Sequence, residues 1–136
     1  MIVGFTGTEK GMTSAQKQTL CLLLDSLDVT EFHHGDCVGA DAEAHEIALD
    51  RGIRIVIHPP TDSKKRAFCK GAVEIREPKP YLDRNHDIVD EGDGALIATP
   101  FEEKEILRSG TWATVRYAYK MGRAVDVFVI RPEGWV

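Results

Sequence analysis

Short apolar segments alternate with segments of helical spacing along this chain of 136 residues, and this alternation constrains the fold more than any other feature. Five apolar segments are typical of strands. They cover residues 2–5, 28–34, 53–58, 95–98 and 124–130. Strands that alternate with helices pair in parallel, with right-handed crossovers. The pattern therefore predicts an α/β, three-layer sandwich with a mainly parallel five-stranded sheet in the order 3-2-1-4-5.

Four intervening segments carry the spacing and the end signals of helices. They cover residues 13–27, 40–51, 81–91 and 110–121. Thr13 or Ser14 caps the first of these and Ser109 the last, whereas Gly52 and Gly122 are typical of helix stops.

Between the third and fourth of the five predicted strands, the pattern weakens. Residues 61–80 form a polar loop with a short strand near residues 72–75. The chain has no linker, repeat or low-complexity tract, so residues 1–136 are expected to form one domain.

Composition excludes several classes of protein. A net charge of −5 argues against a nonspecific nucleic-acid binder, which needs a basic surface, and the only basic cluster, at residues 64–66, is typical of a solvated turn. Three cysteines without C-x-x-C spacing indicate reduced thiols in a cytoplasmic protein. No apolar segment approaches the ~18 residues of a membrane span.

The clearest candidate for chemistry is the junction at residues 35–41, which reads G-D-C-V-G-A-D. Gly35 and Gly39 permit close approach of a ligand to the backbone. A strand–glycine turn–helix junction directs backbone N–H groups and a helix dipole at one point, which favours an anion such as phosphate. Asp36 lies within this turn, and Asp41 would bind a ribose hydroxyl or brace the loop. A tight turn without a ligand is the alternative.

A second junction of this kind opens the last helix at Ser109, Gly110 and Thr111. Small hydroxyl residues with a glycine suit a phosphate, although an ordinary capped helix start gives the same pattern. Gly7 and Thr8 follow the first strand, next to the predicted reversal of strand order, where ligands bind. Two phosphate-type turns in one small α/β domain predict a bound nucleotide.

Arg84 and Asn85 lie on the helix before the fourth predicted strand. A guanidinium can hold a phosphate by two hydrogen bonds, and an Asn can recognise an amide or hydroxyl edge. An exposed helical face is the alternative for this pair.

A metal site is a further candidate, formed by His33, His34, Cys37 and His45, which fall within thirteen residues. Their spacing differs from that of known zinc sites. His33 and His34 also point to opposite faces of a strand. We therefore expect no metal and no cofactor. Cys37 is expected to be a small buried residue, rather than a nucleophile activated by the helix start.

Taken together, these motifs resemble the SLOG superfamily, a Rossmann-like group that includes the LOG-type phosphoribohydrolases and the DprA/Smf DNA-processing proteins. The resemblance rests on the turn at 35–41, the Arg84-Asn85 pair, the strand at 95–98 and the turn at 109–111. It covers nearly the whole chain in order and spacing, and is strongest to small stand-alone members of unknown function. It implies a nucleotide-derived ligand and a homo-oligomer.

The chain departs from the enzymes of this group at two positions. LOG enzymes carry P-G-G-x-G-T-x-x-E, in which the Glu acts at the ribose. The corresponding position here is Thr114, and one glycine of the turn is replaced by Arg108 or Ser109. Nucleoside 2-deoxyribosyltransferases, which the C-terminal half also resembles, need a Glu nucleophile in the same region.

Two functions follow from this comparison. The first is a module that binds a nucleotide or a nucleotide-derived small molecule, as a sensor or by sequestering it. The second is an N-glycosidic-bond hydrolase or a deoxyribosyltransferase-like enzyme that acts on nucleoside monophosphates, and it would need a substitute carboxylate. The candidates are Asp36, Asp41, Asp83, Asp87 and the glutamates of residues 102–105. A purely structural, self-associating domain is the third possibility, with Trp112, Tyr117 and Tyr119 as packing residues.

The predicted ligand site combines all four segments. Its residues are Gly7, Thr8, Gly35, Asp36, Gly39, Asp41, Arg84, Asn85, Ser109, Gly110 and Thr111.

Overall fold

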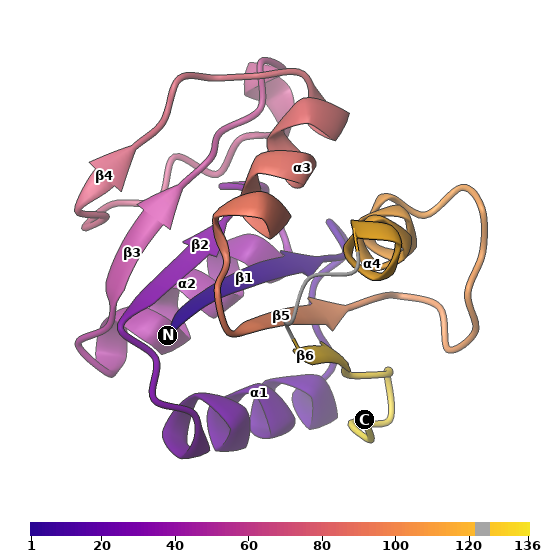
Figure 1. Ribbon diagram of the computed structural model, residues 1–136. Coiled ribbons are helices and arrows are strands. Elements are labelled where there is room, and N and C mark those ends of the chain that lie inside the picture. The colour runs from indigo at the N-terminus through magenta and orange to yellow at the C-terminus, as the bar shows by residue number, and fades with distance from the viewer. Residues whose placement is uncertain (122–125) are drawn as a thin grey trace.

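The computed structural model describes residues 1–121 and 126–136, and within these ranges a parallel six-stranded sheet lies between two layers of helices (Figure 1). The strands are β1 (Ile2–Gly7), β2 (Glu31–His34), β3 (Arg54–Ile57), β4 (Glu74–Ile75), β5 (Ala95–Thr99) and β6 (Asp126–Val129). The helices are α1 (Ser14–Ser26), α2 (Ala40–Asp50), α3 (Tyr81–Glu91) and α4 (Gly110–Met121), with a short 3₁₀ helix at Ser63–Lys65.

The order of the strands is β4-β3-β2-β1-β5-β6, and every pairing is parallel. The predicted order of the five main strands is confirmed. The expected five-strand total was too low by one, because β4 adds to the edge beside β3 through the pairs Val56–Glu74 and Ile57–Ile75. This strand has only two residues, and it lies where the sequence predicted a short strand near residues 72–75.

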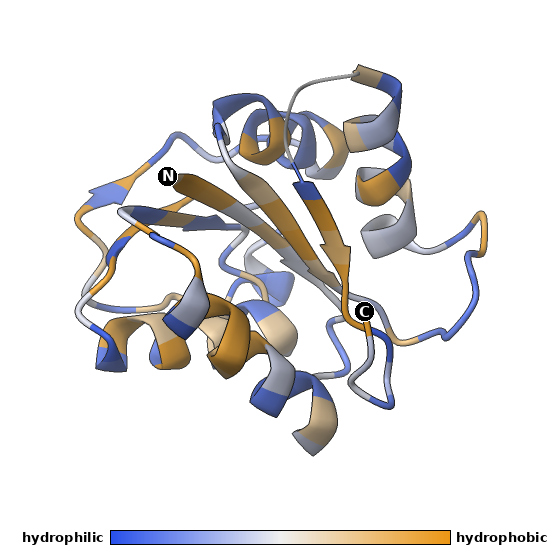
Figure 2. Ribbon diagram, turned by 60° about the horizontal axis from the view of Figure 1, so that its bottom comes forward, coloured by the Kyte–Doolittle hydropathy of each residue, from blue (hydrophilic) through white to orange (hydrophobic). Residues whose placement is uncertain are grey.

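Each face of the sheet is covered by two helices, α1 and α2 on one side and α3 and α4 on the other (Figures 1 and 2). Most residues of β1 and β5 are apolar or small, and Figure 2 shows orange and pale strands in the middle of the sheet, because a sheet covered on both faces has no polar side. The strands β2 and β4 are more polar. Phe5 and Phe32 pack with ring centroids 5.6 Å apart in the layer toward α1 and α2. This packing joins β1 and β2 on the face covered by α1 and α2.

Local signals placed the helices where the sequence predicted them. Thr13 caps α1 in a capping box with Gln16. The buried Gln16 amide also donates to the carbonyls of Pro100 and Ile130, so it ties α1 to the chain after β5 and β6. The predicted helix stop at residue 122 lies outside the described residues, and so do residues 124 and 125, the first two of the predicted last strand. Within those residues, no helix has both the length and the apolarity needed to cross a bilayer.

Candidate functional site

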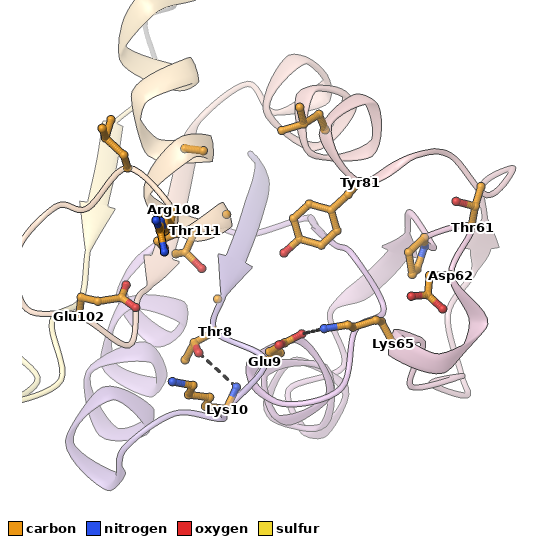
Figure 3. Close-up of a pocket in the computed structure, with 17 residues that line it drawn as sticks. Thr8, Glu9, Lys10, Thr61, Asp62, Lys65, Tyr81, Glu102, Arg108 and Thr111 are labelled. Carbon is orange, nitrogen blue, oxygen red and sulfur yellow. Dashed lines mark hydrogen bonds and ion pairs between the residues drawn. The ribbon is translucent and has the colours of Figure 1, made fainter.

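A cavity of about 630 Å³ opens at the carboxyl ends of the strands, between the loop after β1 and the start of α4 (Figure 3). From β1 the chain builds the sheet first toward β2 and β3 and later returns to β5 on the other side. The cavity therefore lies at the reversal of strand order, where open parallel sheets bind their ligands. Its volume lies within the range of small-molecule sites.

The lining comes from five segments of the chain. It consists of Gly7, Thr8, Glu9, Lys10, Pro60, Thr61, Asp62, Lys65, Tyr81, Leu82, Glu102, Leu107, Arg108, Ser109, Gly110, Thr111 and Ala113. Five of the eleven residues predicted for the site are among them, from the loop after β1 and from the start of α4.

The start of α4 offers unused hydrogen-bond donors to the cavity. Ser109 caps the helix by accepting a hydrogen bond from the Trp112 amide at 3.1 Å. Among the described residues, the amides of Gly110 and Thr111 have no hydrogen-bond partner. Gly110 has no side chain, and the Tyr81 ring packs closely against its backbone. A Cβ at Gly110 would lie only 2.8 Å from the Cε1 atom of Tyr81. The helix start therefore combines free N–H groups with a positive dipole.

Three cations and three carboxylates line the cavity. Lys65 pairs with Glu9 at 2.8 Å, and Lys10 lies over the Phe101 ring at 4.0 Å from its centroid. Arg108 has no ion pair among the described residues, and in Figure 3 it lies beside Thr111, with Tyr81 across the cavity. Positive charge is therefore available next to the start of α4.

Among the three carboxylates that line the cavity, Glu102 has a buried oxygen, Oε1, without a hydrogen-bond partner among the described residues. A buried acceptor without a partner is costly, and a ligand hydroxyl would supply one. Of the substitute carboxylates considered from the sequence, Glu102 is the one that lines the cavity.

The turn at residues 35–41 does not line the cavity, and it uses its own amides internally. The amides of Gly35 and Cys37 both donate to Asp41 Oδ2, at 3.1 and 3.2 Å. The amide of Asp36 donates to His34 Nδ1, and that of Val38 donates to the Lys65 carbonyl. The predicted phosphate cradle in this turn is therefore occupied by the protein itself. Of the two roles considered for Asp41, the structure shows the bracing one.

Gly39 is nevertheless required for a structural reason. It adopts φ +92°, and a Cβ there would lie 2.3 Å from the carbonyl oxygen of Glu9. The turn thus packs directly against the backbone of the loop after β1, which lines the cavity. The amide of Ala40 donates to the Thr8 carbonyl at 3.0 Å and joins the same two segments.

Arg84 and Asn85 are buried behind the cavity wall rather than exposed in it. The Arg84 guanidinium donates to the carbonyls of Gly35 and His58 and to Asn85 Oδ1. It also lies 4.7 Å from the centroid of the Tyr81 ring. The predicted phosphate clamp is therefore a cross-brace that joins α3 to the chain after β2 and β3.

Two buried carboxyl groups belong to this bracing network. Burial raises the pKa of Asp41 to about 6, and the nearby Arg84 guanidinium and the two amide donors limit the rise. Asp36 adopts φ 54° and pairs with Arg66 at 2.8 Å while accepting from the Cys69 amide. Both groups hold loops in place.

Three further residues that the sequence singles out are buried. Trp112 is buried and packs with Ala98 and Val115, which fits the packing role considered for it. Thr114 is also buried, and its hydroxyl donates to the Gly110 carbonyl, so the position of the LOG glutamate does not line the cavity. Cys37 is buried, as expected, and burial raises the pKa of its thiol.

Sequence reasoning missed much of the wall that faces α4. Tyr81 begins α3, and Thr61 and Asp62 follow β3. Glu9 and Lys10 follow the predicted Gly7-Thr8 pair directly. The signal that was available is their place after the carboxyl end of a strand, since such loops meet at one edge of a parallel sheet.

The four residues considered together for a metal lie on different faces of the sheet. His34 contacts His45 of α2, whereas His33 contacts His58 and lies toward Glu91 of α3. The predicted opposite orientation of the two histidines is confirmed.

No family model, no curated protein and no solved structure matches this chain.

Proposed function

We propose that this protein binds a nucleotide or a nucleotide-derived small molecule, as a sensor or by sequestering it, and that the phosphate lies at the start of α4. The observation that carries this proposal is the cavity at the reversal of strand order, with the free amides of Gly110 and Thr111 beside Arg108. Backbone N–H groups, a helix dipole and a guanidinium favour a phosphate at the same point.

The rest of the cavity suits a sugar and a base. Tyr81 packs against Gly110 at the start of α4 and offers an aromatic ring to the cavity, and the carboxylates of Asp62 and Glu102 are acceptors for sugar hydroxyls. Carboxylates repel a phosphate, so the ligand is oriented with its phosphate at Arg108.

Binding is tested by isothermal titration against nucleoside monophosphates, nucleotide sugars and ADP-ribose. We expect Arg108→Gln to weaken the affinity about tenfold or more, because it removes a charge-assisted hydrogen bond. Arg54→Gln is the matched control. Arg54 is exposed and begins β3, so it lies at the amino-terminal ends of the strands, away from the cavity. If none of these ligands binds, or if both variants bind equally well, the proposal is wrong.

A second function is favoured by Glu102. An enzyme that hydrolyses an N-glycosidic bond needs a carboxylate near C1′, where positive charge develops as the bond breaks. Glu102 provides a carboxylate with an unpartnered oxygen in the cavity. Water would add to C1′ while the base leaves with the bonding electrons and takes up a proton.

Hydrolysis is tested by incubating nucleoside monophosphates with the protein and measuring free base by chromatography. We expect Glu102→Gln to lower the rate about a hundredfold while binding persists. Glu103→Gln is the control, because this neighbour is exposed and does not line the cavity. Tight binding without release of base would leave the binding function alone.

A further inference from the structure

Two buried histidines and a glutamate converge on the sheet face covered by α3, and none of them lines the cavity. His33 belongs to β2, His58 follows β3, and Glu91 is the last residue of α3. One nitrogen or oxygen from each side chain lies within 4.8 Å of those from the other two. These residues are distant in the sequence, so no spacing motif marks them.

The hydrogen bonds of His33 leave one of its nitrogens facing the other two residues. His33 Nε2 lies 2.6 Å from Glu31 Oε1, and this carboxylate holds a proton on Nε2. In the neutral ring, Nδ1 then carries the lone pair, and it lies 2.8 Å from His58 Nε2. A carboxylate on the far nitrogen is the usual outer partner of a metal-binding histidine.

Glu91 presents its carboxylate to both rings at distances too long for hydrogen bonds. Its Oε1 lies 3.9 Å from His33 Nδ1, and its Oε2 lies 4.0 Å from His58 Nδ1. Each gap is close to twice a metal–ligand bond of about 2.0–2.2 Å. Arg76 donates to Oε1 and orients the carboxylate without using Oε2.

We propose that His33, His58 and Glu91 bind one divalent transition-metal cation such as Zn²⁺. Two imidazoles and one carboxylate form a donor set that suits such cations. On binding, the His58 ring turns, the cation takes the place of the proton between His33 Nδ1 and His58 Nε2, and that proton passes to solvent. The Glu91 side chain is 35% exposed, so solvent reaches the cation and a water completes its coordination.

A similar group lies on the other face of the sheet, and its histidine nitrogens are all engaged in hydrogen bonds within the protein. In the trio of His34, His45 and Cys69, the Asp36 amide donates to His34 Nδ1. His34 Nε2 then bonds His45 Nδ1, and His45 Nε2 bonds the Lys70 carbonyl. Every ring nitrogen there already has a protein partner, so this trio serves as the internal control.

Zinc binding is measured by titration calorimetry and by the metal content of protein dialysed against Zn²⁺. We expect one equivalent to bind, and Glu91→Gln and His58→Asn each to weaken the affinity by about tenfold or more. Both replacements keep polar groups of similar shape, and circular dichroism checks that each variant folds. Cys69→Ser is expected to bind zinc as the natural chain does.

Cobalt distinguishes the two trios by spectroscopy. Co²⁺ at the proposed site has only nitrogen and oxygen ligands, so its spectrum lacks a thiolate charge-transfer band. The proposal is overturned if no equivalent of Zn²⁺ binds, if Glu91→Gln and His58→Asn leave the affinity unchanged, or if Cys69→Ser abolishes binding.

Discussion

Replacing Gly39 with alanine is expected to lower the free energy of unfolding by about 4 kcal/mol. Two effects add. The backbone at Gly39 adopts φ +92° and ψ −128°, which L side chains rarely occupy. The new Cβ would also lie 2.3 Å from the Glu9 carbonyl oxygen and 2.5 Å from the Glu9 carbonyl carbon. Because the obstructing atoms belong to the backbone, no side chain can rotate away to relieve the contact.

Gly52→Ala provides the matched control for this prediction. Gly52 also has a positive φ, +69°, but a Cβ there has nothing within 4 Å. The control therefore measures the backbone cost alone, about 1 kcal/mol. Both values come from urea unfolding monitored by circular dichroism. Equal losses in the two variants would mean that the turn at residues 35–41 does not pack on the loop after β1.

The second large effect is on the pH dependence of stability through Asp41. The pKa of this group is about 6 when folded and 3.8 in its ordinary state, so between these values the folded protein binds more protons than the unfolded chain. Stability from this group is therefore greatest in acid and falls as the pH rises from about 4 to about 6. The whole change amounts to about 3 kcal/mol.

Asp41→Asn isolates this contribution. The variant has no titratable group at position 41, and all its other titratable residues are unchanged. We expect the unfolding free energy of the natural chain, minus that of the variant, to fall by about 2 kcal/mol between pH 4 and pH 7, the rest of the change lying below pH 4. Urea unfolding at a series of pH values measures this difference. A difference that stays constant across the range would show that Asp41 is not buried against Arg84 as described.

Much of the candidate site could be predicted from the sequence where the signal is local. Ser109, Gly110 and Thr111 form a helix start with a cap, and residue type alone favours that geometry. Gly7 and Thr8 follow the first strand, and the order of elements places that loop at the reversal of strand order. These five residues line the cavity because each is fixed by its own element.

The remaining predicted residues failed to reach the cavity because of contacts distant in sequence. Gly35, Asp36 and Asp41 resemble a phosphate turn, yet their polar groups pair with each other and with Arg66 and the Cys69 amide. A residue type shows which hydrogen bonds a group can make. It does not show which partner the tertiary structure places beside that group.

Arg84 illustrates the same limit. A helical arginine is equally suited to a ligand phosphate and to backbone carbonyls, and the sequence does not distinguish these partners. The packing of α3 against the chain after β2 and β3 brings the carbonyls of Gly35 and His58 to its guanidinium. The tertiary structure alone made it a brace.

By itself, the sequence determined the parallel sheet, the order of its main strands, the helices and the donors at the start of α4. These depend on the period of apolar residues and on capping, which act over a few neighbouring positions. The tertiary structure decided which loops share the cavity, that Glu102 faces it, and that His33 meets His58 and Glu91. Those encounters depend on how distant segments pack, and no local pattern encodes that packing.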